Sequence, residues 1–179
     1  MSLAGRELIL GVTGSIAAYK AVYLLRELTR LGAGVTVCLT EHAAQFVAPL
    51  TFRTLSGRPV LTDLFDPQSA DAVEHVALVE RAHAILVAPA TANLLAKAAH
   101  GIADDFLTTL LLAARAPVLM VPAMDGGMWE HRRSSPMSRR CAGAASRCSS
   151  PIRARSPRAC RARGGSPNPT RSSRRSCGC

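Results

Sequence analysis

The sequence predicts an α/β fold in which a parallel sheet is covered by helices on both faces. Two observations predict it. Strand-like and helix-like segments alternate along the first 131 residues. The strand-like segments are continuously apolar, which is typical of strands buried on both faces and unlike the alternating pattern of a half-exposed sheet.

Four short apolar runs are predicted to be the strands. Glu7–Val12 (ELILGV) is the first, and a turn, Thr13-Gly14-Ser15, follows it. Residues 35–39 (VTVCL) are rich in β-branched side chains. The same pattern predicts the last two strands at residues 84–88 (AILVA) and 118–121 (VLMV).

The segments between these strands have the features of helices. Residues 16–31 carry apolar side chains at helical spacing with charged residues between them. Ser15 is predicted to be the N-cap of this helix, and Gly32 and Gly34 are predicted to end it. Two further helices are predicted in segments rich in leucine and alanine, at residues 91–100 and 104–114.

The carboxyl ends of the predicted strands form a candidate ligand pocket, because ligands of parallel sheets bind at that edge. These ends are small and polar: residues 13–15, 40–42, 89–93 and 122–125. Gly14 and Ser15 at a helix start suit a phosphate, since free N–H groups point outward there. A plain turn is the alternative interpretation. The segment matches neither the dinucleotide-binding nor the P-loop pattern.

His75 is the candidate acid or base. It lies beside Glu74 in a segment expected to be a loop, and a histidine there can move a proton near neutral pH. A solvated surface histidine is the alternative interpretation. No cysteine and histidine spacing in the first 131 residues matches a zinc site, so no metal is expected, and Cys38 is predicted to be a buried strand thiol.

Charge divides the chain of 179 residues into two parts. Residues 1–131 hold 9 Lys and Arg and all 12 acidic residues, whereas residues 132–179 hold 13 Arg and five of the six cysteines. The second part has no Leu, Val, Phe or Tyr, so it cannot bury enough apolar surface to fold and is predicted to be a disordered basic tail. No apolar run reaches the roughly 18–20 residues of a membrane helix. The division predicts one folded domain, 1–131, followed by a tail, 132–179.

Four motifs of the folded part resemble the flavin-containing cysteine decarboxylase family, and within it the phosphopantothenoylcysteine decarboxylase domain. They occur in family order and spacing: GVTGSIAAYK at residues 11–20, EHVAL at 74–78, PATANLLAKAAHGIADD at 89–105 and VPAMDGGMWEH at 121–131. The resemblance implies a flavodoxin-like, Rossmann-like three-layer fold. It also implies a cytoplasmic homo-oligomer, a trimer or a multiple of trimers, that binds no nucleic acid and no membrane.

The resemblance implies FMN as the cofactor and decarboxylation of a C-terminal cysteine conjugate, phosphopantothenoylcysteine, as the reaction in coenzyme A biosynthesis. His75 matches the catalytic histidine, and Asp125 and Met128 match substrate-binding positions. The family commonly has Asn where this chain has Asp125, and an ionised Asp would repel a substrate carboxylate. The implied cofactor-binding residues are Gly14, Ser15, Ile16, Thr40, Thr91, Ala92, Asn93 and Ala123.

Two other functions fit parts of the sequence. A flavin prenyltransferase-like protein shares the fold and the cofactor. A nucleic-acid-binding protein would use the arginine-rich tail to contact phosphates, although the tail has no aromatic residues for base stacking.

The tail has the composition of a GC-rich gene translated out of frame. In a frame shifted by one base, residues 132–138 permit PAVQSNV and residues 157–177 permit ASGLSGPGRLPEPDEIVAAVL, both similar to the family's continuation. The second segment includes the glycine-rich flap over the substrate. A frameshift near residue 131 therefore predicts a chain that lacks this flap and turns over poorly.

Overall fold

A six-stranded parallel sheet is the centre of the computed structural model, which describes residues 2–63, 74–132 and 146–148. The strand order is β3-β2-β1-β4-β5-β6, and every pair of neighbours is parallel. The strands are β1 (Glu7–Val12), β2 (Gly34–Leu39), β3 (Val60–Leu61), β4 (Ala84–Ala90), β5 (Val118–Pro122) and β6 (Ser146–Cys148).

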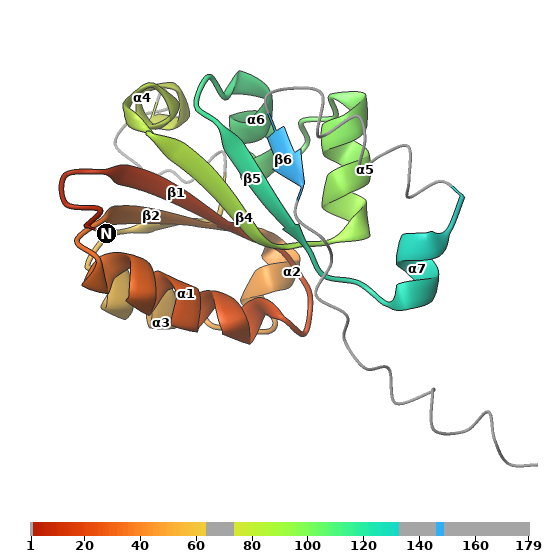
Figure 1. Cartoon of the computed structure of the whole chain (residues 1–179), viewed down its shortest axis with the longest axis horizontal. Coiled ribbons are helices and arrows are strands. Elements are labelled where there is room, and N and C mark those ends of the chain that lie inside the picture. The colour runs from red at the N-terminus through yellow and green to blue at the C-terminus, as the bar shows by residue number, and fades with distance from the viewer. Residues whose placement is uncertain (1, 64–73, 133–145, 149–179) are drawn as a thin grey trace, which may run out of the picture.

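Helices cover both faces of this sheet (Figure 1), which confirms the predicted three-layer, Rossmann-like fold. One face carries α1 (Ala18–Arg30) and α3 (Pro49–Ser56), and the other carries α4 (Glu74–Arg81), α5 (Ala92–His100) and α6 (Phe106–Ala113). Two short helices, α2 (Glu41–Ala44) and α7 (Gly126–Glu130), follow the carboxyl ends of β2 and β5. The chain reverses its direction of travel across the sheet between β1 and β4, the kind of position where sheets of this type bind ligands.

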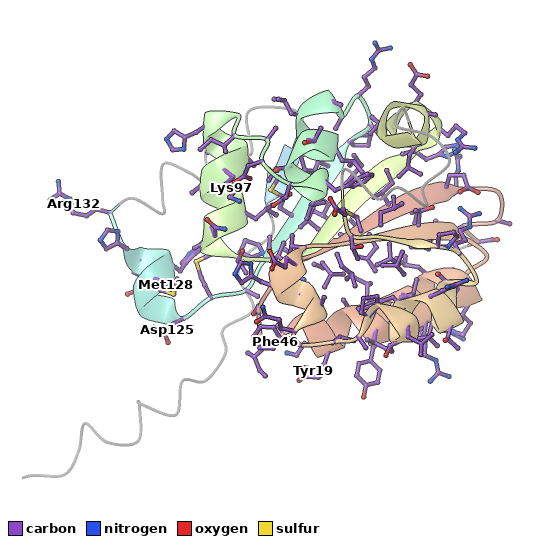
Figure 2. All side chains as sticks on the ribbon, turned by 180° about the vertical axis from the view of Figure 1, so that it is seen from behind. Tyr19, Phe46, Lys97, Asp125, Met128 and Arg132 are labelled. Carbon is purple, nitrogen blue, oxygen red and sulfur yellow. The ribbon has the colours of Figure 1, made fainter. Side chains whose placement is uncertain are left out.

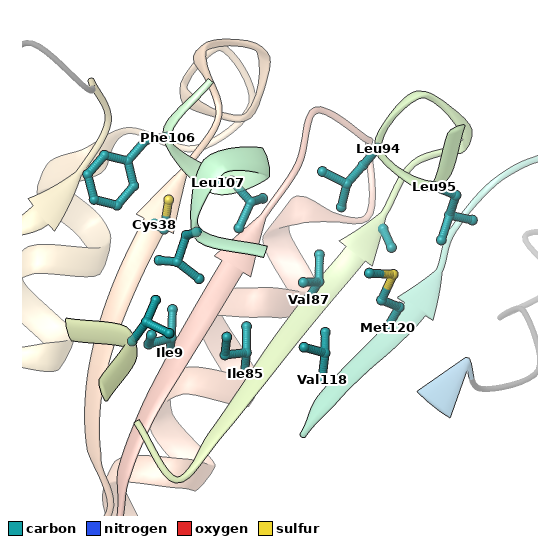
Figure 3. Packing of buried hydrophobic residues seen from close by; sticks show 13 residues of the cluster. Ile9, Cys38, Ile85, Val87, Leu94, Leu95, Phe106, Leu107, Val118 and Met120 are labelled. Carbon is teal, nitrogen blue, oxygen red and sulfur yellow. The ribbon is translucent and has the colours of Figure 1, made fainter. Parts of the chain in front are cut away.

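The apolar strands supply two cores because successive side chains point to opposite faces of a sheet. Ile9 packs in the core beneath α4, α5 and α6, whereas its neighbour Leu10 packs in the core beneath α1 and α3. Figure 3 shows the first of these cores, where Leu94 and Leu107 descend from α5 and α6 onto the strands. The continuous apolar pattern of the strands therefore follows from burial on both faces.

The thiol of Cys38 is buried in this first core, as predicted (Figure 3). Burial raises its pKa, and the charge of Asp105 acts in the same direction. Cys38 is therefore a packing residue in its neutral form.

The start of α1 differs from the prediction. The helix begins at Ala18, and the N-cap is Ala17, which makes no side-chain cap hydrogen bond. Ser15 lies in the preceding turn, where its hydroxyl accepts from the Ala17 N–H at 3.3 Å and its carbonyl accepts from the Ala18 N–H at 2.8 Å. Ser15 was therefore wrongly predicted as the N-cap, because the turn after β1 needs two more residues.

At the other end of α1, Gly32 has the left-handed φ of 88° that suits a helix end. Gly34 is instead the first residue of β2.

Most of the tail lies outside the described residues, and so does the glycine-rich segment at 157–177. The exception is β6, where residues 146–148 pair with residues 118–120 of β5. This pairing uses main-chain groups, so a segment without large apolar side chains can form it.

No helix in the described part of the chain is both long and apolar enough to cross a membrane.

Phe52 gives a direct test of the core beneath α1 and α3. Its side chain is fully buried, so Phe52→Ala is expected to lower the free energy of unfolding by about 3–5 kcal/mol through lost contacts and a cavity. Arg53→Ala on the same helix is the control, because Arg53 is exposed. Denaturant unfolding of both variants measures the difference, and equal losses would contradict the described packing.

Candidate functional site

The hydroxyl group of Thr13 joins the carboxyl ends of the two central strands. Thr13 follows β1 and is 2% exposed. Its Oγ1 donates a hydrogen bond to the Pro89 carbonyl oxygen at 2.7 Å and accepts one from the Thr91 N–H at 3.1 Å. A buried hydroxyl with both partners satisfied fixes the relative position of the β1 turn and the start of α5.

A cleft of about 440 Å³ opens beside this bridge, at the carboxyl edge of the sheet. Four residues predicted to bind a cofactor line it: Gly14, Thr40, Thr91 and Asn93. Thr13, Glu41 and His42 also line it and belong to the strand ends predicted to form the pocket, whereas the prediction missed Leu94, Lys97, Asp104 and Asp105. The topology therefore brings together chain segments that are up to about 90 residues apart, from Thr13 to Asp105.

Gly14 allows the β1 turn to approach α2. A Cβ atom at this position would lie 2.4 Å from the His42 Cβ and 3.0 Å from the His42 backbone carbon. No larger residue fits without a shift of the backbone. The glycine is therefore required by packing between two walls of the cleft as well as by any ligand.

Helix starts contribute polar groups to the cleft. Thr91 is the N-cap of α5, and its Oγ1 accepts from the Leu94 N–H at 3.3 Å. Thr40 caps α2 in the same way, through the Ala43 N–H at 3.3 Å. A hydroxyl that accepts one hydrogen bond can still donate to a ligand, and the start of α5 favours negative charge. This side of the cleft suits an anionic, oxygen-rich group.

The cleft also carries an ionic cluster that the sequence did not predict. Lys97 Nζ lies 2.7 Å from Asp104 Oδ1 and 3.6 Å from Asp105 Oδ2. The hydrogen bond between Lys97 and Asp104 raises the pKa of the lysine and lowers the pKa of the aspartate. The pattern Asp105-x-x-Thr108 could have revealed part of this cluster from the sequence, because it is a capping pattern that places Asp105 at the start of α6.

The remaining predicted cofactor residues are not among those that line the cleft. Ser15 lies in the turn before α1, and Ile16 is 72% exposed. Ala92 is the first residue of α5. Ala123 donates its N–H to the Ala90 carbonyl oxygen at 3.0 Å, so it ties the end of β5 to the end of β4.

The predicted substrate residues lie on α7, outside the sheet (Figure 2). Asp125 is the N-cap of this helix, and its Oδ2 accepts from the Gly127 N–H at 3.0 Å. Met128 is 50% exposed. Both side chains are accessible, and the cap satisfies only one of the oxygens that a carboxylate offers.

His75 is the second residue of α4, so it lies in a helix and not in the loop that was predicted. Its side chain is outside the described part of the structure. The apolar residues after it place the segment on the sheet, since Val79 is buried against β1 and β4. This amphipathic pattern explains why the segment forms a helix.

Known proteins resemble this chain in sequence. The Flavoprotein family profile matches residues 2–142. The coenzyme A biosynthesis bifunctional protein CoaBC of Bacillus subtilis is 50% identical over 129 residues, which is 72% of this chain and 32% of that protein. CoaBC of Mycobacterium tuberculosis strain H37Rv is 52% identical over 126 residues, 70% of this chain and 30% of that protein. The chain thus spans about a third of the length of these curated relatives.

Solved structures of FMN-dependent cysteine decarboxylases superpose on this chain and share its fold. The FMN-dependent cysteine decarboxylase SpaF superposes with a TM-score of 0.76 at 34% identity, over 82% of this chain and 85% of that one. A PPC decarboxylase mutant complexed with pantothenoylaminoethenethiol superposes with a TM-score of 0.71 at 25% identity, over 82% of each chain.

Thr13→Val removes the bridge between β1 and β4 while keeping the shape of the side chain. It leaves the Pro89 carbonyl and the Thr91 N–H without their partner, so the free energy of unfolding should fall by about 1–3 kcal/mol. Thr54→Val is the control, because the exposed Thr54 hydroxyl donates only to its own helix. Thermal unfolding measures both, and a neutral Thr13→Val would contradict the bridge.

Gly14→Ala tests the close approach of the β1 turn to α2. The added methyl group overlaps His42, so a loss of about 1–3 kcal/mol in unfolding free energy is expected. Gly126→Ala has open space around its new Cβ and should be close to neutral. If chemical denaturation gives equal stabilities for the two variants, the tight contact does not exist.

Proposed function

The chain belongs to the flavoprotein family, and from that premise we propose that it binds FMN in the cleft at the carboxyl edge of the sheet. We further propose that its reaction is decarboxylation of a cysteine-ended conjugate, with phosphopantothenoylcysteine as the substrate. The observation that carries the proposal is the set of predicted residues brought together in one cleft: Gly14, Thr40, Thr91 and Asn93.

The cleft has the features that a flavin mononucleotide needs. Its volume is in the range of about 300–1,000 Å³ that is usual for cofactor sites. Gly14 provides backbone without a side chain, and α5 directs its N-terminal end at the cleft. Under the proposal, Gly14, Ser15, Ile16 and Thr40 contact the phosphate and ribityl chain, and Thr91, Ala92, Asn93 and Ala123 lie along the flavin ring.

The residues of the chain have distinct roles in the proposed reaction. FMN, when bound, would supply an acceptor for a hydride equivalent from the substrate cysteine and would return the same two electrons after carbon dioxide leaves the thioaldehyde, so that the decarboxylation is redox-neutral overall. The fold positions the cofactor by the Thr13 bridge, which sets the distance between the Gly14 turn and the Thr91 cap. His75 is proposed to move the proton, and the accessible side chains of Asp125 and Met128 to contact the substrate.

Asp125 takes a position that the family commonly fills with Asn. Asn and Asp are about equally good N-caps, so the cap of α7 does not require the carboxylate. Substrate contact is then the property that distinguishes the two residues, because only the amide can donate to a substrate carboxylate.

We propose that the protein is a cytoplasmic homo-oligomer, a trimer or a multiple of trimers. Large apolar side chains are exposed on the side of the molecule formed by α1 and the α2–α3 segment: Ile16, Tyr19, Tyr23, Phe46 and Leu50. Figure 2 shows Tyr19 and Phe46 at the same outer edge. Exposed apolar clusters of this kind are typical of protein interfaces. Ile16 also follows the Gly14 turn, so this side adjoins the cleft.

The tail is proposed to result from a reading-frame slip near residue 131. The composition of residues 132–179 supports this, because it contains 13 Arg and no acidic residue. A chain with this tail lacks the glycine-rich flap, so substrate would be held poorly and turnover would be slow. Sequencing the coding DNA around codon 131 tests the slip directly.

The function is tested with the purified chain and with His75→Asn. The wild-type protein is expected to be yellow, with a flavin absorption spectrum, and to release carbon dioxide slowly from phosphopantothenoylcysteine. His75→Asn should keep the flavin spectrum and lose the product, since the histidine is assigned to proton transfer and not to cofactor binding. A folded wild-type protein that takes up no FMN would contradict the proposal.

A further inference from the structure

We propose that Lys97 is a positioning residue that neutralises the acidic wall of the cleft, so that a phosphorylated cofactor can enter it. The inference rests on the proposed FMN site and adds a residue that determines which form of the flavin is bound. Lys97 lies on α5 (Figure 2) and is one of the residues that line the cleft.

Acidic side chains line the cleft from two segments of the chain, α2 and the start of α6. Glu41, Asp104 and Asp105 line the cleft, and Lys97 is the only lysine or arginine among its described lining residues. The Lys97 side chain is 21% exposed, compared with 54% for Asp104 and 34% for Asp105. The Lys97 side chain as a whole is therefore the least exposed of the three.

The Asp105 carboxylate and the backbone of the α5–α6 connection are held by contacts that do not involve the lysine side chain. Asp105 is held by the capping box of α6, in which its Oδ1 accepts from the Thr108 N–H at 2.8 Å and from the Thr108 hydroxyl at 2.9 Å. Asp104 donates its backbone N–H to the same hydroxyl at 3.1 Å. The connection between α5 and α6 is closed by the Ile102 N–H, which donates to the Lys97 carbonyl oxygen at 3.0 Å.

The ammonium group therefore contributes charge more than structure. Its removal leaves three carboxylates along a partly enclosed cleft, where charges interact more strongly than in bulk water. A phosphate brings up to two further negative charges into that space. An uncharged ribityl hydroxyl would not meet this repulsion, so FMN and riboflavin should respond differently to the loss of Lys97.

The experiment compares FMN with riboflavin on Lys97→Met. Flavin is removed from the full chain, and each flavin is titrated back while its fluorescence is followed. Lys97→Met is expected to weaken FMN binding about tenfold and riboflavin binding by less than about twofold, and high salt should shrink the difference. Lys97→Arg keeps the charge and should bind FMN like the wild type.

A second pair of variants separates charge from contact. Asp104→Asn in the Lys97→Met background removes one carboxylate and should recover most of the FMN affinity. Asp104→Asn alone should bind FMN at least as tightly as the wild type, which tests the proposal even if Lys97→Met fails to fold. Lys20→Met is the control, because Lys20 is exposed on α1 beside the Tyr19 ring.

The outcomes distinguish this inference from the proposed function. Equal weakening of FMN and riboflavin, or unchanged FMN binding by Lys97→Met, would overturn the role of Lys97 while the wild-type chain still bound FMN. A wild-type chain that binds neither flavin would overturn the proposed function, and this inference with it.

Discussion

The buried hydroxyl of Thr13 determines how the ligand-binding edge of the sheet is arranged. β1 and β4 are neighbours in the sheet although 71 residues separate the end of the first from the start of the second. At their carboxyl ends the ladder stops, and Thr13 continues the connection by one donated and one accepted hydrogen bond. The Gly14 turn and the Thr91 cap are adjacent because of this bridge, and the remaining walls of the cleft are built outward from it.

The cleft combines two opposite electrostatic tendencies. The cap of α5 and the hydroxyls of Thr40 and Thr91 favour an anion, whereas Asp104 and Asp105 repel one. The Asp105 carboxylate is needed where it is because it caps α6, whereas Asp104 contributes its backbone N–H to the same capping network. When carboxylates at the start of a helix line a cleft, a nearby positive charge is needed if the ligand carries a phosphate. Lys97 provides that balance within the same segment of chain.

The sequence was sufficient to predict the sheet and the main helices, because both depend on local patterns. Burial on both faces makes each strand a continuous apolar run, and the predicted bounds of β1 coincide with the observed ones. The short elements α2 and β3 were missed, since four or two residues carry no periodicity, and the eight-residue helices α3 and α4 were not predicted either. The start of α1 was predicted too early in the sequence, because a serine that closes a turn resembles a serine that caps a helix.

The cleft was predicted only in part, for a related reason. Gly14, Thr40, Thr91 and Asn93 follow directly from the rule that ligands bind at strand ends. Lys97, Asp104 and Asp105 belong to the far end of α5 and the start of α6, and only the packing of those two helices turns them toward the cleft. His42 lines the cleft because Gly14 has no side chain, which lets α2 approach the turn after β1.

The pairing of β6 with β5 also bears on how the chain behaves in concentrated solution. A sheet that ended at β5 would present a row of unpaired N–H and C=O groups, with Leu119 on its surface at 41% exposure even with β6 in place. Such an open edge invites strands from other molecules and leads to aggregation. Three residues, Ser146–Cys148, occupy that edge by main-chain pairing. Residues 146–148 therefore cover the edge of β5 through their main chain, and without them the N–H and C=O groups of β5 on that side would be exposed.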